Sequence, residues 1–291
     1  ITLRGTGSIG GGSGAISFYN LTIGDGTTAT TTLSSDASVS NTLTTGTGSQ
    51  LSIASAKTLT DSGTADVSNS GTITGAGTLK FTSATTGGPG TAGTLSSVVR
   101  FDASAANIPS AVFDARTYGG AVELYANNGS ARSITAAAGT YTFSSTLTTT
   151  AGGAGVVTAD LSAATGTTTV TGTVTIGGTT VLSAPTTLSV GGSFANSGTF
   201  THNSGTLTMS GTGTLTTNGN TINNLTTTGS GTITFASATH TLAGNLTLGS
   251  SNTITPGSST IVMSGSGKTI DGGGKTIAGL TISGNTTVSN S

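Results

Sequence analysis

Residues 188–209 read LSVGGSFANSGTFTHNSGTLTM, and residues 242–263, which start 54 positions later, read LAGNLTLGSSNTITPGSSTIVM. Both stretches have apolar residues at the same positions, whereas the residues between these positions differ. Leu188, Phe194, Phe200, Leu207 and Met209 fall opposite Leu242, Leu248, Ile254, Ile261 and Met263. Self-similarity of this kind is typical of a stack of similar units, each of which buries its apolar side against its neighbours.

The second half of this block occurs in three places, at residues 1–23, 207–227 and 261–282. The apolar residues that match are Leu3, Ile9, Phe18 and Leu21 in the first copy, Met209, Leu215, Ile222 and Leu225 in the second, and Met263, Ile270, Ile277 and Leu280 in the third. Both ends of the chain fall inside the pattern, and no polar capping unit is visible. We therefore expect either a piece of a longer chain or subunits that stack end to end.

Short runs such as Thr72-Ile73-Thr74 and Thr232-Ile233-Thr234-Phe235 alternate apolar residues with threonine. This period of two predicts half-buried strands with one dry side and one hydroxyl side. Gly-rich and Asn-rich turns separate the runs, and helical spacing is absent. The pattern predicts an all-β protein, a right-handed parallel β-helix with little or no helix. Dividing the block into three coils of about 18 residues gives about 16 coils and a rod ~75 Å long.

Composition limits the chemistry that this chain can perform. Lys, Arg, Asp and Glu together make up 17 of 291 residues, whereas Thr contributes 68 and Gly 48. A net charge of −1 provides no electrostatic footprint for nucleic acid or an anionic membrane. No apolar run is long enough to span a bilayer. We expect a protein that is not an enzyme and that uses no cofactor or metal.

Residues 87–145 depart from the pattern and hold six of the 17 charges, whereas no charge occurs between Asp160 and Lys268. We expect one solenoid over 1–291, with regular coils at 1–86 and 146–291 and variant coils with longer loops at 87–145. The variant coils are the best candidate for an interaction loop. Its predicted residues are Arg100, Asp102, Asp114, Arg116, Tyr118, Glu123, Tyr125 and Arg132.

A polysaccharide-cleaving site would need two carboxylates, or a carboxylate and a base, that converge on one sugar. Asp102, Asp114, Arg116 and Glu123 are the group dense enough to form one, but Arg–Asp pairing on an exposed loop is the favoured interpretation. His202 and His240 are expected to be exposed turn residues rather than metal ligands. Residues 271–275, DGGGK, are expected to form a turn. The aspartates Asp25, Asp36, Asp61 and Asp66 lack the fixed period of a calcium-binding repeat.

The threonines themselves are a further candidate surface. Stacked coils would align them into ladders of hydroxyl and methyl groups, a surface chemistry associated with ice-binding solenoids. Threonine is also a strong strand former, and its outward hydroxyl keeps the surface of an uncharged rod hydrated. A binding module for glycan or ice, through these ladders or through the 87–145 loops, therefore stays open as an alternative function.

Four segments carry a resemblance to a known type: FYNLTI at 18–23, INNLT at 222–226, SGTLTMSGTGTL at 204–215 and IPSAVFDARTYGG at 108–120. They resemble the Gly/Thr/Ser-rich β-strand-repeat proteins of bacterial surfaces. More distantly, they are similar to the β-helical shafts of autotransporter passengers and filamentous-haemagglutinin-type adhesins. The resemblance implies secretion, an extracellular or cell-surface location and a role in adhesion, filaments or a coat. It transfers no functional residue.

The function predicted from the sequence is therefore that of a structural shaft in a surface filament or adhesin. The expected partners are further copies of the chain, head to tail or side by side, or the rest of a longer chain. A surface glycan is an additional candidate partner.

Overall fold

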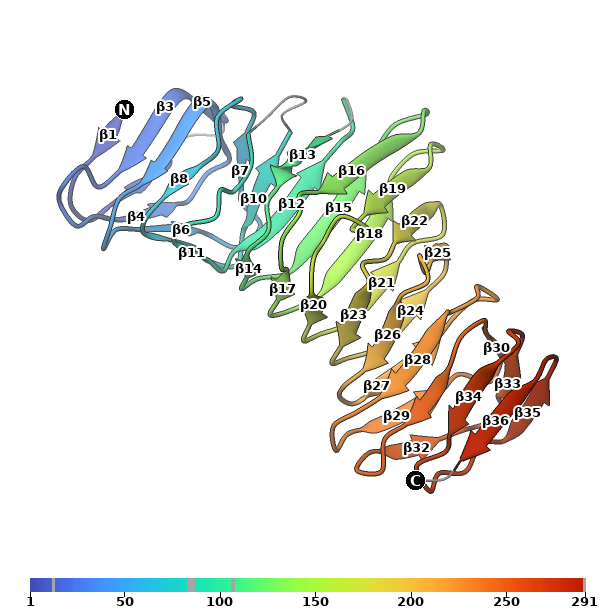
Figure 1. Cartoon of the computed structure of the whole chain (residues 1–291). Helices are drawn as coiled ribbons and strands as arrows, with labels where there is room; N and C mark the ends of the chain where they lie inside the picture. The colour runs from blue at the N-terminus through green and yellow to red at the C-terminus, as the bar shows by residue number, and fades with distance from the viewer. Residues whose placement is uncertain (12–13, 83–86, 106–107, 290–291) are drawn as a thin grey trace.

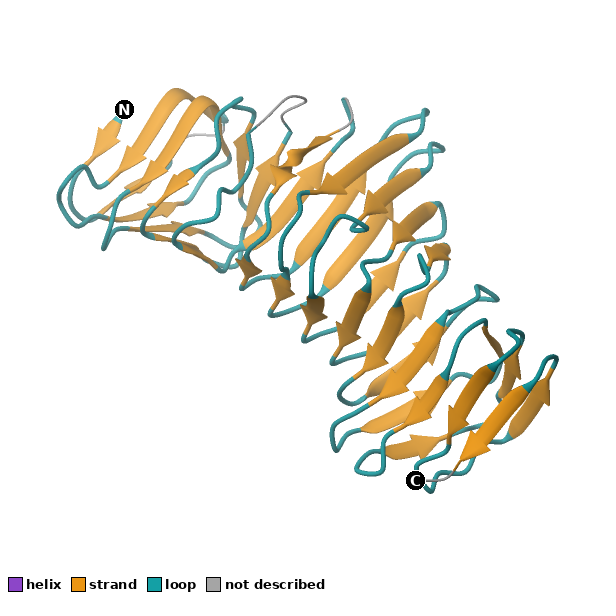
Figure 2. Ribbon diagram, in the orientation of Figure 1, coloured by secondary structure: helices purple, strands orange, loops and turns teal. Residues whose placement is uncertain are grey.

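A computed structural model describes residues 1–11, 14–82, 87–105 and 108–289 of the chain. Across these residues every regular element is a β-strand, and the strands wind into a parallel β-solenoid of about 13 turns (Figures 1 and 2). The all-β, parallel prediction is confirmed. The right-handed sense stays a prediction. Figure 1 shows a bent rod that runs from the N-terminal coils to the C-terminal coils.

The first face of the rod is one sheet that runs almost its whole length. Its strands, in spatial order, are β1 (Thr2–Leu3), β3 (Ile16–Ile23), β5 (Ala37–Thr45), β7 (Thr58–Asp61), β10 (Thr78–Phe81), β12 (Val98–Asp102), β15 (Val122–Ala126), β18 (Leu147–Ala151), β21 (Val174–Ile176), β24 (Phe194–Asn196), β27 (Gly213–Thr216), β29 (Thr232–Phe235) and β32 (Thr253–Thr255). The short strand β8 (Ser68–Asn69) pairs with the second half of β5.

The second face consists of two sheets placed end to end. The N-terminal sheet contains β2 (Gly7–Ile9), β4 (Thr30–Leu33), β6 (Gln50–Ile53), β9 (Thr72–Thr74) and β11 (Thr94–Leu95). The longer sheet contains β14 (Thr117–Tyr118), β17 (Thr142–Phe143), β20 (Thr167–Val170), β23 (Thr187–Val190), β26 (Thr206–Met209), β28 (Asn224–Thr227), β31 (Leu246–Leu248), β34 (Lys268–Asp271) and β36 (Thr286–Ser289). The amide of Gly119 donates to the carbonyl of Leu95 at 2.7 Å and joins the two sheets.

The third face is the least continuous. It begins with β13 (Ile108–Phe113), β16 (Arg132–Ala136), β19 (Val157–Asp160), β22 (Thr180–Ser183) and β25 (Thr199–Thr201). After a coil without a regular strand, it resumes with β30 (Thr239–Leu242), β33 (Thr260–Met263) and β35 (Gly279–Ile282). A single bridge between Ile222 and Leu242 spans the interruption.

Successive turns lie about 21 residues apart, so the predicted coil of about 18 residues is wrong. Leu207 pairs with Leu225, which is 18 positions later, but Leu147 pairs with Val174, which is 27 positions later. The strands keep a similar length while the turns between them vary. Dividing the 54-residue block into three equal coils therefore underestimated the number of residues per coil.

The 54-residue block does not contain a whole number of coils. Leu188 lies in β23 on the second face, whereas its counterpart Leu242 lies in β30 on the third face. The chain returns to the second face at β26 and β28 before it reaches β30, so the block spans more than two turns and fewer than three. The inward-facing alternation looks the same on every face, and for this reason the sequence repeat can shift from one face to the next.

A column of apolar side chains fills the rod, but its composition changes along the axis. Between β10 and β17 the column is aromatic: the rings of Phe81 and Phe101 are 5.5 Å apart, and those of Phe113 and Tyr141 are 5.1 Å apart. Further on, leucine, isoleucine and valine dominate, with two ring pairs, Phe194 with Phe200 and Phe235 with His240. Burial of these side chains supplies the main driving force for stacking. No helix among the described residues is long and apolar enough to cross a membrane.

Candidate functional site

The predicted interaction residues separate into two groups in the structure. Arg100, Asp102, Glu123 and Tyr125 lie on β12 and β15 and face outward from the first face. Asp114, Arg116 and Tyr118 lie around the start of β14, where the chain enters the second face. Arg132 is separate from both groups, on β16 of the third face. One loop was predicted, and the structure contains two distinct sites instead.

The first group is an outer charge cluster. Register pairs Lys80 with Arg100, and Arg100 with Glu123, in successive coils. Arg100 donates through Nε and Nη2 to Oε2 of Glu123, at 2.8 and 2.7 Å. Its guanidinium carbon lies 4.7 Å from the centre of the Tyr125 ring. The negative charge of Glu123 thus compensates the two positive charges of Lys80 and Arg100, which lie in successive coils. The Arg100–Glu123 pair is partly exposed and therefore stabilises the fold by ~1 kcal/mol at most.

Asp102 closes a turn at the end of the same strand. Its Oδ1 accepts hydrogen bonds from the amide of Ser104, at 3.0 Å, and from the Ser104 hydroxyl. A carboxylate that accepts from the residue two positions later is a turn-forming aspartate. The side chain therefore has a local structural role on the rim of the outer charge cluster.

The second group forms what we call the Arg116 clamp, the contacts of Asp66, Asp114 and Arg116 with the turn at 88–93. Arg116 is only 7% exposed, and its guanidinium donates to the carbonyls of Pro89, Gly90 and Gly93, at 2.9, 2.7 and 2.9 Å. Asp114 accepts from the amide of Gly90 at 2.9 Å, and Asp66 accepts from Gly88 at 3.0 Å. One cation and two carboxylates, from the coils before and after it, thus hold a single turn.

The turn needs glycine at its corners. Gly90 and Gly93 have φ angles of 63° and 66°, which lie in the left-handed region. A Cβ at Gly93 would also approach the carbonyl oxygen of Asn69 to 2.4 Å. The tight turn brings the carbonyl groups of residues 89, 90 and 93 within reach of one long side chain, that of Arg116.

Burial shifts the ionisation of the Arg116 clamp. Burial, and then the nearby charge of Asp66, raise the pKa of Asp114 to about 6. Burial also lowers the pKa of Arg116. The hydroxyl of Tyr118 donates to the Asp114 carbonyl at 2.8 Å and places the phenol beneath the turn. The polar groups of the Arg116 clamp are therefore used in hydrogen bonds that hold the protein's own backbone.

Asp61 is a buried carboxyl group that sequence reasoning missed. It ends β7 at an inward position, in register with Phe81 of the next coil and Val39 of the previous one. The amide of Gly63 donates to its Oδ1 at 2.9 Å. Burial raises the pKa of Asp61 to about 6. The TLTD pattern at 58–61 was the available signal, because it places the aspartate where other strands carry an apolar residue.

The two histidines differ in their surroundings. His202 lies directly before the turn at Asn203 and Ser204 and is half-buried rather than exposed as predicted. Its Nδ1 accepts from the amide of Ser204 at 3.0 Å. The prediction for His240 is wrong, because this side chain is fully buried on β30. The Ala236 carbonyl lies 3.0 Å from Nε2, which must therefore carry the proton, while Nδ1 accepts from the Thr217 hydroxyl at 3.0 Å. Burial lowers the pKa of His240.

The THT run at 239–241 has the same alternation as TIT elsewhere and could have indicated an inward histidine. Among the described residues, no group of three or more His, Cys, Asp or Glu side chains is placed to hold a metal ion.

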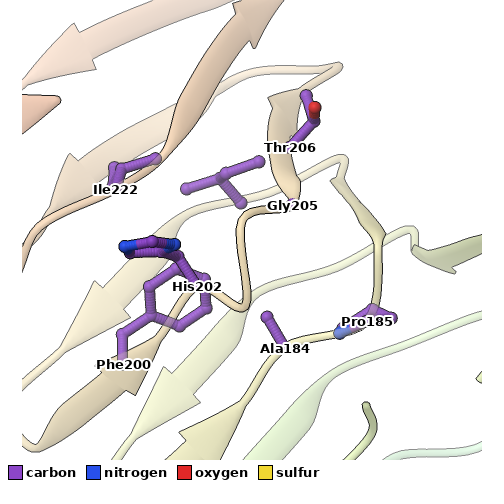
Figure 3. A pocket seen from close by; sticks show the side chains of 8 residues that line it. Ala184, Pro185, Phe200, His202, Gly205, Thr206 and Ile222 are labelled. Carbon is purple, nitrogen blue, oxygen red and sulfur yellow. The ribbon is translucent and has the colours of Figure 1, made fainter. Parts of the chain in front are cut away.

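A shallow depression marks the interruption of the third face (Figure 3). Figure 3 shows the rings of Phe200 and His202 on one side of it and Pro185 on the other. It has no space wide enough to enclose a water molecule. The depression is therefore a packing gap where β25 has no regular strand above it.

Asp114 and Glu123, the carboxylates considered for sugar cleavage, have different partners. Glu123 pairs with Arg100 on the first face, whereas Asp114 binds the backbone of the turn at 88–93. Neither residue lines the depression of Figure 3. The geometry of the described residues therefore provides no convergence of these two carboxylates on one sugar.

Comparison with known proteins gives no relative: no family model, no curated protein and no solved structure matches the chain.

Proposed function

We propose that this chain is a non-enzymatic structural protein, the shaft of an extracellular filament or adhesin. The observation that carries the proposal is the unbroken path of paired strands along the first face, from β1 to β32. Hydrogen bonds between coils run along the rod, and the apolar column is shared from coil to coil. Such a stack keeps two ends at a fixed separation without needing any reactive group.

Surface features at the C-terminal end of the described structure support a stacking role. Strands β35 and β36 each pair on one side, with β33 and β34. Their side chains Leu280, Ile282 and Val288 are 40%, 43% and 60% exposed. A further coil of the same pattern would cover these side chains and pair with both strand edges. In the proposed role that coil belongs to a second copy of the chain.

Electron microscopy and sedimentation of the purified chain would test the proposal. We expect rods whose length grows with protein concentration, because open parallel edges add head to tail without closing. Val288→Lys should shorten them, since it places a charge on the stacking edge. Val156→Lys is the matched control, because Val156 is 42% exposed in a turn midway along the rod. Monomers at every concentration, or equal shortening by both variants, would contradict the stacking role.

A further inference from the structure

The second face carries two straight columns of hydroxyl and amide side chains over β20, β23, β26, β28 and β31. These strands pair without a register shift, so outward positions repeat from coil to coil. One column consists of Thr169, Ser189, Thr208, Thr226 and Thr247. The other consists of Thr167, Thr187, Thr206, Asn224 and Asn245, the last joined through its amide to the Asn224 side chain.

Several of these hydroxyl groups have no hydrogen-bond partner within the described part of the protein. Side-chain bonds on this face join Ser189 to Ser210 at 3.2 Å and Asn224 to Thr206 at 3.3 Å. The hydroxyls of Thr187, Thr208 and Thr226 bond to no described group. A threonine hydroxyl can both donate and accept, so these columns present free donors and acceptors to solvent.

The two other faces carry only shorter hydroxyl columns, such as Thr214, Thr234 and Thr255 on the first face. On the first face, register places Ala195 between Thr175 and Thr216, and the outer charge cluster occupies the coils before them. The third face is interrupted between β25 and β30. The hydroxyl columns of the second face, in contrast, continue over five successive coils. They lie within a stretch without any charged residue, 161–267.

This chemistry favours a rigid, periodic partner over a soluble one. The columns have no charge, aromatic ring or cavity, which are the features that hold a small ligand. Weak contacts at many positions add up only if the partner presents its groups at matching intervals. Here the intervals are ~4.8 Å along the rod and ~6.7 Å across each strand. Water molecules in ice repeat over distances of this size and both donate and accept hydrogen bonds.

From this match we propose that the hydroxyl columns of the second face bind ice. The hydroxyls bond to lattice water, and the threonine methyl groups pack between lattice positions. Because the binding surface is the side of the rod, ice binding is independent of the stacking proposed at its end.

The test is ice recrystallisation by the whole chain, with one variant in each of two faces. Thr208→Tyr places a bulky ring in the middle of the columns. Thr175→Tyr is the control, since Thr175 is equally half-buried and faces outward on β21 of the first face. We expect the unmodified chain to arrest recrystallisation, Thr208→Tyr to need about tenfold more protein, and Thr175→Tyr to match the unmodified chain.

Thermal unfolding should show that both variants fold. Two results would overturn the proposal: an unmodified chain no better than an unrelated protein of equal mass, or equal loss in the two variants. A pull-down with crystalline cellulose identifies the competing partner. Binding to cellulose without any effect on ice would also overturn it.

Discussion

The segment 87–145 and the charge-free segment 161–267 belong to one solenoid but satisfy their polar groups by different means. In the first segment, Arg116 and Asp114 bind the backbone of a partly buried turn, and Arg100 pairs with Glu123 on the surface. In the second, neutral amides bind the backbone instead. Asn196 donates to the Thr217 carbonyl at 3.0 Å and accepts from the amide of Gly198 at 2.9 Å.

The comparison shows that the stack specifies geometry and leaves the side-chain chemistry open. Both segments keep parallel strands and an inward apolar column, although the register between β13 and β16 shifts in the first. What changes is the column, which is aromatic beside the charges and mostly aliphatic where charges are absent. A coil can therefore be specialised without any change to its neighbours, since each coil contacts mainly the coils directly before and after it.

The largest effect is expected from breaking the Arg116 clamp. Arg116→Ala leaves three carbonyls and the half-buried carboxylate of Asp114 without their cation, so the free energy of unfolding should fall by ~3–5 kcal/mol. Urea unfolding followed by circular dichroism measures the loss. A fall below ~1 kcal/mol would mean that the turn at 88–93 does not depend on its arginine.

A pH dependence should distinguish the N-terminal half from the charge-free coils. The pKa of Asp61 is raised to about 6 in the folded chain, above the ordinary value of 3.8. The folded state therefore binds the proton more tightly. Its stabilisation is fully present below pH ~4 and is lost as pH rises through ~6, by up to ~3 kcal/mol.

Asp61→Asn should remove the part of this dependence that Asp61 contributes and raise stability at pH 7, because the amide avoids a buried charge. The part contributed by Asp114, whose pKa is also raised to about 6, should remain. Asp36→Asn is the control, since Asp36 lies on an exposed turn and accepts from the amide of Thr58 at 2.9 Å. Denaturant midpoints between pH 4 and pH 7 provide the measurement. An unmodified chain that becomes less stable as pH falls through this range would contradict the assignment to Asp61.

A smaller loss is expected in the charge-free segment from Asn196→Ala. The substitution removes both bonds of a buried neutral amide and leaves the amide of Gly198 without its acceptor, at a cost of ~1–3 kcal/mol. Hydrogen exchange should show the loss in the coils of β24 and β27 and not in those of β12 and β15. A loss equal to that of Arg116→Ala would remove the distinction between the two segments.

The smallest effect is expected from Arg100→Ala in the outer charge cluster. The pair with Glu123 is partly exposed, so its removal should change stability by ~1 kcal/mol or less. The midpoint of urea unfolding should also depend little on salt. A loss as large as that of Arg116→Ala would show that the outer charge cluster, rather than the clamp, stabilises the segment.

The period of two was enough to predict parallel strands and many of the inward residues. Thr232–Phe235, for example, is a strand in the structure with the expected inward Ile233 and Phe235. The number of residues per coil could not be predicted, because it depends on turns that vary while strands stay similar. The alternation also does not encode which face a strand joins. For this reason the two copies of the 54-residue block place equivalent residues on different faces.

The candidate site was less predictable than the fold. Local density grouped Arg100 with Arg116, yet the first faces solvent and the second is buried. The separation arises because Arg100 lies within a strand and Arg116 lies in the turn before β14. The partners of Arg116 are backbone carbonyls 23 to 27 positions away, which carry no side-chain signal. Asn290 and Ser291, where the last repeat was expected to break off, lie outside the described residues.

Engineered disulfides test the central claim most directly, because the chain has no native cysteine. Register pairs Thr148 with Thr175, at the passage from the variant coils into the charge-free coils. Neighbouring parallel strands bring Cα atoms to ~4.8 Å, within disulfide range. Cysteines at 148 and 175 should therefore cross-link on mild oxidation, whereas cysteines at 148 and 167, on different faces, should not. Cross-linking of the second pair without the first would contradict the solenoid register.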